Sequence, residues 1–448
     1  MRIAVIGSGI SGLGSAYLLN HHADIHLFEC DHRLGGHSHT VEADFDGRKV
    51  PVDTGFIVFN PLNYPNLIAL FDRLMVPWID SDMSFAVSLR DGQCEYEGSL
   101  GGLMAQPANL ARPRYWSMLR DLTRFYRTGY ACAFQGPETE TLAGFIKRER
   151  YGSAFVEDHL LPMGAAIWSC SARTMMEYPV RSLLQFMENH KLLNFIDRPQ
   201  WRTVKGGSRE YVNRIANALG GPRGGRIHLN SRISGLRREQ GGVMLSIEGE
   251  GDVWFDRVVM AAHADQSLAL ISDATRAERD ILSSFRFQPN RAVLHSDPRL
   301  MPRRRAAWGS WNYIGGEGIG GEGIGGDGVD TSLCLTYWMN RLQSIDDCYP
   351  LFETLNPHRE PDPALVHGSY SYMHPVFDDR AVAAQRRLAE IQGTDNLYFA
   401  GAWTGHGFHE DGLKSAIAIT RTMGFEVPWA TDVAAYRRPV ITEAREIA

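Results

Sequence analysis

The chain has 448 residues, of which 44% are hydrophobic and 22% are charged. This balance is typical of a globular protein with a large core and excludes disorder, collagen and coiled coil as the main architecture. At roughly 100–200 residues per domain, the length predicts two or three domains. The formal net charge of −6 gives no overall attraction to nucleic acid, so no nucleic-acid partner is expected.

The six cysteines form no Cys-x-x-Cys pair, and their density is far below that of a disulfide scaffold, so we expect reduced thiols. No apolar run reaches the roughly 18 residues that a membrane-spanning helix needs. The first strand is expected to begin at Arg2, which leaves no room for a targeting peptide before it. We therefore expect a cytoplasmic protein, with peripheral contact at the inner membrane surface left open.

A strand, a glycine-rich turn and a helix open the chain. Arg2 to Ile6 is a short apolar run, Gly7 to Gly12 follows the pattern Gly-x-Gly-x-x-Gly, and Leu13 to Leu19 has helical character. A second apolar run, Ile25 to Glu29, ends in an acid. This order of elements is typical of a domain that binds a dinucleotide.

Each position in this unit has a physical role in such binding. Gly7 allows the tight turn, Gly9 lets the backbone approach a pyrophosphate, and Gly12 lets the helix pack on the strand. The helix N-terminus supplies free amide groups and a partial positive charge, and Ser11 is included in the expected site. Glu29 would accept hydrogen bonds from a ribose diol. The alternative is a glycine-rich turn without a ligand.

A pair of glycines, Gly35 and Gly36, follows Glu29 closely. It offers a second place where the backbone can lie against a cofactor, which a domain that binds only NAD does not need. A hairpin turn is the alternative for the pair taken alone. Together with the first motif, the pair favours FAD over NAD.

A third cluster lies near the other end of the chain. We expect a strand over Asn396 to Gly401, a loop from Ala402 to Gly412 and a helix from Leu413 to Thr422, with Asp411 as the helix N-cap. This helix N-terminus also opens out of a glycine-rich loop. Placed near a flavin pyrimidine, it would stabilise negative charge on the reduced ring.

In these three clusters the chain resembles the flavin-containing amine oxidase superfamily, which includes amine oxidases, carotenoid desaturases, protoporphyrinogen oxidases and fatty-acid isomerases. The resemblance covers residues 2–59, a central strand near 256–262 and residues 396–421. More narrowly, the chain is similar to a bacterial branch of predicted NAD/FAD-binding oxidoreductases in the segments 35–37, 308–313 and 405–413. Members of that branch often accompany lipid methyltransferases, and related activities include desaturation of methylated fatty acyl chains.

The resemblance implies an α/β fold with the two-domain architecture of amine oxidases: a Rossmann-like FAD-binding domain and a mixed α+β substrate domain. We expect the discontinuous FAD-binding domain at 1–75, 203–265 and 390–430, and the substrate domain at 76–202 and 266–389. Residues 314–328 repeat a glycine-rich pentapeptide, which predicts a flexible loop without a metal site. Residues 431–448 are expected to form a C-terminal tail.

The same resemblance assigns cofactor contacts to all three clusters, and Ser11 and Gly35 belong to the same expected site. The implied contacts are Gly7, Gly9, Gly12 and Glu29 on the ADP half, Arg33 beside the pyrophosphate, Gly401 and Ala402 near the pyrophosphate or ribityl chain, Gly36 and His37 along the ribityl chain or flavin edge, Thr54, Gly55 and Phe56 at the isoalloxazine, and Asp411, Gly412 and Leu413 at the flavin pyrimidine.

Departures from the family pattern bear on the chemistry. His37 stands where the family commonly has arginine, and Ala402 stands where it commonly has glutamate. Residues 288–293 match the place of the lysine that holds a water near flavin N5 in amine oxidases, but they include no lysine. The C-terminal motif has no cysteine for a covalent flavin link. These departures favour non-covalent FAD and argue against amine oxidation.

The segments between the clusters are rich in apolar residues. A helix expected over Arg114 to Arg127 has a basic face that is either a contact for acidic headgroups or a solvated surface. An amphipathic stretch from Leu183 to Ile196 forms core, lines a tunnel or dips into a membrane. His263 either faces the cofactor or caps a loop. The aromatic residues expected to wall an apolar channel, with core packing as the alternative, are Trp311, Tyr313, Tyr337, Trp338 and Trp403.

We expect an FAD-dependent oxidoreductase that moves a hydride from a C–H bond of a hydrophobic, fatty-acyl or lipid substrate to flavin N5, producing a double bond. His37, His406 and His409 are the candidate bases for the second proton. The alternatives are a flavin amine oxidase that produces peroxide, a redox-neutral fatty-acid double-bond isomerase and a flavoprotein that only senses redox state. The expected partners are a small hydrophobic substrate and, by the resemblance, a functional link to a lipid methyltransferase.

Overall fold

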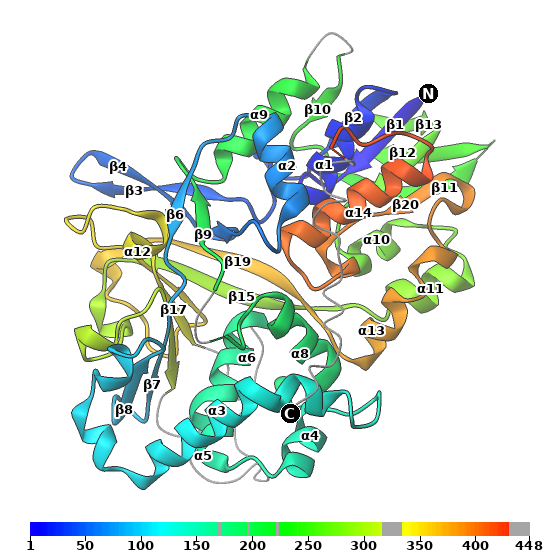
Figure 1. Cartoon of the computed structure of the whole chain (residues 1–448). Coiled ribbons are helices and arrows are strands. Elements are labelled where there is room, and N and C mark those ends of the chain that lie inside the picture. The colour runs from blue at the N-terminus through cyan, green and yellow to red at the C-terminus, as the bar shows by residue number, and fades with distance from the viewer. Residues whose placement is uncertain (169–171, 195–197, 221–223, 240, 316–333, 430–448) are drawn as a thin grey trace.

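The computed structural model (Figure 1) describes residues 1–168, 172–194, 198–220, 224–239, 241–315 and 334–429. Most of the predicted glycine-rich loop, from residue 316 on, and the predicted tail at 431–448 lie outside the described residues. Among the helices that the structure does describe, none has the length and apolar character needed to cross a bilayer.

One sheet consists of five parallel strands. Their order is β10 (Arg226–His228), β2 (Asp24–Phe28), β1 (Arg2–Ile6), β14 (Arg257–Met260) and β20 (Leu397–Phe399). The strands are short apolar runs, as expected for parallel strands whose two faces are both covered. The pairing of β1 with β14 and of β14 with β20 places the first residues of the chain close to residues 397–399.

Helices cover one face of this sheet, and a second sheet with further helices covers the other (Figure 1). On the first face lie α1 (Ile10–Leu19), α2 (Pro65–Arg73), α9 (Arg209–Leu219) and α14 (His409–Thr422). On the second face lie the antiparallel strands β11 (Ile233–Glu239), β12 (Gly242–Ile247) and β13 (Gly251–Phe255), with α10 (Ala264–Leu270), α11 (Arg276–Leu282) and α13 (Asp379–Gln385).

A separate seven-stranded sheet forms the other half of the molecule. Its order is β19 (Val366–Val376), β15 (Arg286–His295), β18 (Phe352–Leu355), β17 (Leu335–Trp338), β16 (Trp311–Gly315), β7 (Phe85–Leu89) and β8 (Cys94–Glu97). Only the pair β7 and β16 is parallel among the neighbours in this sheet. The two long strands β15 and β19 run from this sheet toward the parallel one (Figure 1).

A helical layer packs beside the seven-stranded sheet around one apolar core. It contains α3 (Pro113–Ala133), α4 (Leu142–Glu149), α5 (Ser153–Phe155), a π-helical turn at Val156–Leu160, α6 (Leu161–Trp168), α7 (Ala172–Met176) and α8 (Val180–Asn189). The remaining strands are the hairpin β3 (Thr40–Phe45) and β4 (Arg48–Asp53), and the small sheet of β5 (Val58–Phe59), β9 (Trp201–Val204) and β6 (Trp78–Ser81).

The predicted α/β class, with a Rossmann-like sheet and a second mixed region, is confirmed. The parallel sheet takes its strands from 1–75, 203–265 and 390–430, and the seven-stranded sheet takes its strands from 76–202 and 266–389. The amphipathic stretch from Leu183 is helical only as far as Asn189, where α8 ends, and its residues Leu183, Leu184 and Met187 are buried in the helical core.

Candidate active site

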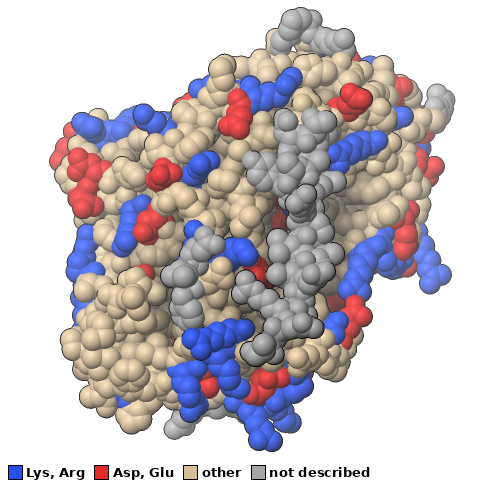
Figure 2. All heavy atoms as spheres, in the orientation of Figure 1, with Lys and Arg blue, Asp and Glu red and all other residues tan. Residues whose placement is uncertain are grey.

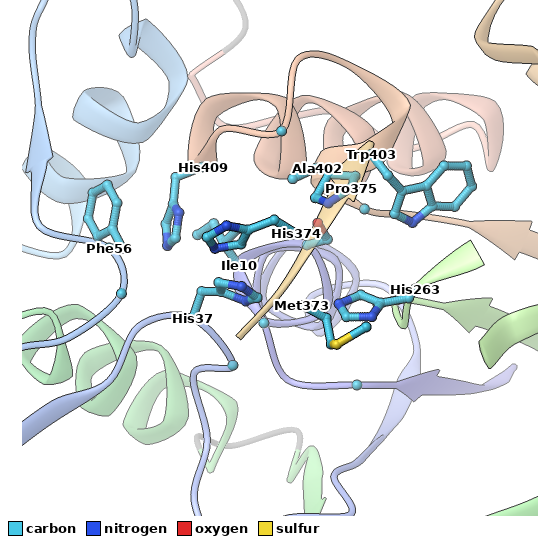
Figure 3. Close-up of a pocket in the computed structure, with 18 of the residues that line it drawn as sticks. Ile10, His37, Phe56, His263, Met373, His374, Pro375, Ala402, Trp403 and His409 are labelled. Carbon is cyan, nitrogen blue, oxygen red and sulfur yellow. The ribbon is translucent and has the colours of Figure 1, made fainter. Parts of the chain in front are cut away.

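A cavity of about 810 Å³ extends from the first glycine turn to the seven-stranded sheet and the helical layer. Figure 3 shows part of its lining, which comes from both ends of the chain and from β19 between them. The predicted site residues that line it are Gly7, Gly9, Ser11, Glu29, Gly36, His37, Gly55, Phe56, Trp311, Tyr337, Gly401, Ala402, Trp403, His406 and His409.

The glycines of the first turn have the conformations that dinucleotide binding requires. Gly7 has a φ of 99°, which an L side chain rarely adopts, and it directly follows β1. A Cβ at Gly9 would meet no atom within 4 Å, so the backbone there is open to the cavity. A Cβ at Gly12 would overlap the carbonyl oxygen of Gly7, so Gly12 serves helix packing and lies outside the lining. The helix begins at Ile10, three residues before the predicted start at Leu13.

The carboxylate of Glu29 is held in place at the end of β2. It accepts hydrogen bonds from the backbone amide of Ser8 at 2.9 Å, from the Ser8 hydroxyl at 2.5 Å and from the amide of Asp31 at 2.9 Å. Ser231 lies nearby, since its amide donates to the carbonyl of Glu29 at 2.9 Å. The buried Ser231 hydroxyl lines the cavity and has no partner among the described residues. It is therefore suited to bind a polar group of a ligand at this end.

The second glycine pair lies directly against the first turn. A Cβ at Gly36 would come within 3.0 Å of the Cα of Gly9, and the amide of Gly35 donates to the carbonyl of Ser8 at 3.0 Å. A Cβ at Gly55 would overlap the carbonyl of His37, and the amide of Phe56 donates to that carbonyl at 2.8 Å. The segments around Gly36 and Gly55 thus lie together along one wall of the cavity.

Three predicted contacts in this region support the wall from behind. Arg33 donates from its guanidinium to the carbonyl of Gly36 at 2.9 Å, and Thr54 shares a hydrogen bond of 2.6 Å with the hydroxyl of Tyr372. Neither of these residues, nor Gly35, belongs to the cavity lining. Sequence comparison with a family cannot separate such supporting residues from direct contacts, because both occur in the same short motif.

The C-terminal helix differs from its prediction. α14 begins at His409 with Phe408 as its N-cap, so Asp411 is not the N-cap but lies in the first turn. The carboxylate of Asp411 accepts hydrogen bonds from the amides of His406 and Phe408, both at 3.1 Å. A Cβ at Gly412 would come within 2.7 Å of the Ser11 hydroxyl, so α14 crosses α1 closely there. Asp411, Gly412 and Leu413 therefore shape and pack the helix, and they do not line the cavity.

Five histidines line the cavity, four of which Figure 3 labels. They are His37, His263, His374, His406 and His409. Burial lowers the pKa of His409 to about 3 and that of His374 to about 4, and it lowers the pKa of His37 well below the ordinary value. These three imidazoles are neutral at pH 7 and can each accept a proton or hydrogen bond at a ring nitrogen.

Two of these rings are already held by polar neighbours. The Asn290 amide nitrogen lies 3.1 Å from Nδ1 of His374, and the Asn290 carbonyl oxygen accepts from Asn356 at 2.7 Å. Because the Asn290 oxygen accepts from Asn356, its amide nitrogen faces His374 and donates to Nδ1, so the ring proton of neutral His374 is assigned to Nε2. Nε2 of His409 lies 2.9 Å from the Ser38 hydroxyl, and its ring stacks on Phe56 with centroids 3.7 Å apart.

His37 lies next to His374 in the cavity, as Figure 3 shows. Its ring centroid is 5.5 Å from that of His374 and 5.2 Å from that of Tyr372. His263, which was expected to face the cofactor or to cap a loop, lines the cavity and occupies the N-cap position of α10. His374 stands in no sequence motif, and the pairing of β19 with β15 brings it to this place.

The far end of the cavity is lined by apolar and aromatic residues. Besides Trp311 and Tyr337, these include Ile57, Val58, Met83, Ile167, Trp168, Trp201 and Phe377. Trp403 also lines the cavity, but it packs on Phe285 in the core of the parallel sheet. The indole nitrogens of Trp168 and Trp311 are buried without a partner among the described residues. Two predicted channel residues lie elsewhere. Tyr313 is in the core of the seven-stranded sheet, and Trp338 points away from its neighbour Tyr337 to pack on Trp308, because successive strand residues face opposite sides.

Solved structures similar to this chain share its fold over nearly the whole length. A conjugated-linoleic-acid-producing fatty acid isomerase from P. acnes is 15% identical with a TM-score of 0.61, and the match covers 94% of this chain and 98% of that one. Cyclohexylamine oxidase from Brevibacterium oxydans is 15% identical with a TM-score of 0.63, covering 94% and 99%. A putrescine oxidase bound to putrescine is 13% identical with a TM-score of 0.64, covering 97% and 99%. No protein of curated function matches the chain.

The sequence profile of the flavin-containing amine oxidoreductases matches residues 10–294, well over half of the chain. The open backbone at Gly9, the held carboxylate of Glu29 and the unpaired Ser231 hydroxyl fit the ADP half of FAD. The prediction that the chain uses FAD and is an oxidoreductase is thereby confirmed. The chain belongs to the flavin-containing amine oxidoreductase family and is an FAD-dependent oxidoreductase.

Proposed function

We propose that this oxidoreductase desaturates an esterified acyl chain of a lipid, which carries no charge on the chain itself, and that it binds FAD without a covalent link. The observation that carries the proposal is the distribution of charge in the cavity. Among the described lining residues, Glu29 is the only carboxylate and Arg232 is the only arginine or lysine, and both belong to the dinucleotide end. The substrate end offers apolar surface, aromatic rings and imidazoles that burial keeps neutral.

This distribution disfavours ionised substrates. An ammonium group at the substrate end would be buried without a carboxylate, and a free carboxylate would be buried without a cation. None of the described lining residues is a lysine, so the group expected to hold water near the flavin in amine oxidases has no counterpart there. An esterified acyl chain carries no charge on the chain itself and matches the apolar lining.

The chain's own residues supply orientation, water exclusion and a proton acceptor. Trp168, Trp311 and Trp403 form rigid walls that favour a dry site, and the indole of Trp403 is anchored by a hydrogen bond of 3.2 Å to the carbonyl of Ala262. When bound, FAD supplies the hydride acceptor at N5. His37 is the candidate to take the second proton, because Ser38 and Asn290 already engage His409 and His374.

The sharpest test is anaerobic mixing of the FAD-loaded enzyme with phosphatidylcholine that carries mono-unsaturated, methyl-branched or cyclopropane acyl chains. We expect the flavin absorbance to bleach and the acyl product to be two hydrogens lighter. The branched and cyclopropane lipids also test the functional link to a lipid methyltransferase. Bleaching by amines and by none of the lipids would overturn the proposal and favour an amine oxidase.

A redox-neutral isomerase is the second candidate, favoured by the fold shared with a fatty acid isomerase over nearly the full length. The same cavity can serve this reaction, because hydride would leave the acyl chain and return to it at another carbon. The mass of the product distinguishes the isomerase from the desaturase. An unchanged mass with a moved double bond, and no lasting bleaching, indicates isomerisation.

A further inference from the structure

Three large apolar side chains are exposed together on the outer side of the half of the molecule that holds the seven-stranded sheet. Leu100 is 88% exposed, Met104 is 51% exposed and Trp116 is 55% exposed. Leu100 precedes a short helix, η1 (Gly102–Met104), and a second short helix, η2 (Pro107–Ala111), leads into α3. η1 contacts η2, and η2 contacts α3, so the three exposed side chains stand on neighbouring elements, and we call the region that carries them the α3 face.

This surface is held rigidly from beneath. The hydroxyl of Tyr115 donates to the carbonyl of Leu103 at 3.0 Å, and Tyr115 and Met118 are buried in the core of the sheet. The indole nitrogen of Trp116 donates to the carbonyl of Leu110 at 2.8 Å. Because its only polar atom is satisfied within the protein, the exposed part of the Trp116 ring is hydrocarbon and gains little from contact with water.

Arginines surround the apolar centre. Residues 98–120 include no aspartate, glutamate or lysine, and their charged side chains are Arg112, Arg114 and Arg120. Arg120 follows Trp116 by one helical turn, its side chain is 74% exposed, and Arg127 continues the same face of α3. On the opposite side, η5 (Arg305–Ala307) contacts η1 and is preceded by two more exposed arginines, at 303 and 304.

The carboxylates near this surface are engaged inside the protein. Glu95 is buried and accepts from the guanidinium of Arg304 at 2.9 Å, and Glu97 accepts from the amide of Ser99 at 3.0 Å. Asp158 is buried and pairs with Arg114 at 2.8 Å. Figure 2 agrees with this distribution: the corner that carries β7 and β8 in Figure 1 is largely free of charged side chains, with basic groups at its edges.

We propose that the α3 face docks on the surface of an anionic phospholipid bilayer. Leu100, Met104 and Trp116 would enter the boundary between headgroups and acyl chains, where an indole ring is favoured. The exposed arginines that are not used to hold Glu95 or Asp158, namely Arg120, Arg127 and Arg303, would pair with lipid phosphates, to which a guanidinium binds through two parallel hydrogen bonds. The charge pattern selects this occupant, since an apolar centre flanked by exposed arginines on α3 and before η5 matches an anionic bilayer. Docking depends on neither the substrate nor the reaction proposed above.

The test is sedimentation of the FAD-loaded full chain with vesicles. We expect it to pellet with phosphatidylcholine vesicles containing phosphatidylglycerol, more weakly with pure phosphatidylcholine, and less at high salt. The double variant Leu100→Asp/Met104→Asp and the single variant Trp116→Asp should each weaken binding at least tenfold. The double variant Arg120→Gln/Arg127→Gln should lose roughly tenfold or more at low salt, since each arginine near an anionic surface contributes about fivefold.

Matched controls come from the other half of the molecule. Met75 is 78% exposed beyond the end of α2, and Arg276 is exposed on α11. Met75→Asp and Arg276→Gln should bind vesicles as the wild type does, and all variants should keep their flavin absorbance. The proposal is overturned if the wild type ignores anionic vesicles, or if variants of the α3 face bind them unchanged. It is also overturned if the wild type is a dimer that Trp116→Asp makes monomeric, since a second copy then covers this face.

Discussion

At the scale of single residues, the first glycine turn separates a ligand contact from a packing contact. Gly9 has an ordinary extended conformation and faces open space, whereas Gly12 has no room for a side chain. We expect Gly9→Val to leave the apoprotein's melting temperature nearly unchanged but to abolish FAD retention. Gly12→Ala should lower the stability of the apoprotein itself by about 1–3 kcal/mol. Flavin absorbance per protein and thermal melts of both apoproteins check this, and a Gly9→Val protein that purifies fully yellow contradicts it.

The second residue-scale prediction concerns His37. His37→Gln keeps a polar side chain but removes the proton acceptor, so we expect turnover to fall about 10²- to 10⁴-fold with FAD still bound. Because burial holds the pKa of His37 below its ordinary value, the neutral form persists into mild acid. The acid limb of the wild-type kcat/KM profile should therefore lie below pH 6.5. The exposed His32→Gln is the control, and equal loss of activity in both variants would contradict the assignment.

Which of these residues could be predicted depends on how local their signal is. Gly9, Glu29 and His37 stand in short motifs whose spacing is visible in the sequence, and all three line the cavity. His374 stands in no such motif. It reaches the cavity through the antiparallel pairing of β19 with β15, in which it stands opposite Gln288. Its hydrogen-bond partner Asn290 is 84 residues away in the sequence.

At the scale of elements, both helices that follow a glycine-rich loop begin about one turn earlier than predicted. α1 begins at Ile10 and α14 at His409, each earlier than the apolar pattern indicates. The prediction had assigned these first turns, residues 10–12 and 409–412, to the glycine-rich loops. The difference matters for α14, because it turns His409 from a loop residue into a helix residue fixed against Phe56.

Glu410, also in the first turn of α14, ties this helix to α2. Its carboxylate accepts from the amide of Leu67 at 3.0 Å and from the side chain of Asn66 at 2.5 Å. Burial raises the pKa of Glu410 to about 7, so the folded state holds a proton that the unfolded state loses near pH 4.5. Its contribution to stability is therefore fully present below pH 4.5 and is lost as the pH rises to about 7.

Glu410→Gln removes this titration while keeping the side chain's shape. Relative to this variant, we expect the wild type to lose about 2 kcal/mol of stability between pH 5 and pH 8. Urea unfolding of both proteins at several pH values measures the difference. A gap between the two proteins that stays constant over this range would show that Glu410 is not protonated in the folded state at pH 5.

At the scale of the whole molecule, the site exists because distant segments meet. β1, β14 and β20 are neighbours in one sheet, so the glycine turn after β1 and the loop after β20 open on the same cavity. Motifs predicted this meeting, since each one matches a known part of an FAD site. The substrate half was less predictable. Trp338 faces away from its cavity-lining neighbour Tyr337, whereas Tyr313 shares the face of Trp311 on β16 but lies further along the strand, in the core of the sheet.

A single FAD molecule that contacts both ends of the chain should stabilise both ends together. At a concentration 100 times its dissociation constant, FAD would add about 2.7 kcal/mol to the stability of the folded state, which is a rise of a few degrees in melting temperature. More specifically, hydrogen exchange should slow on FAD addition both at Gly7–Ser11 and at Ala402–His409. Strand β12, which does not line the cavity, should slow only as far as the rise in overall stability requires. Protection of only one of the two segments would mean that they do not grip the same molecule.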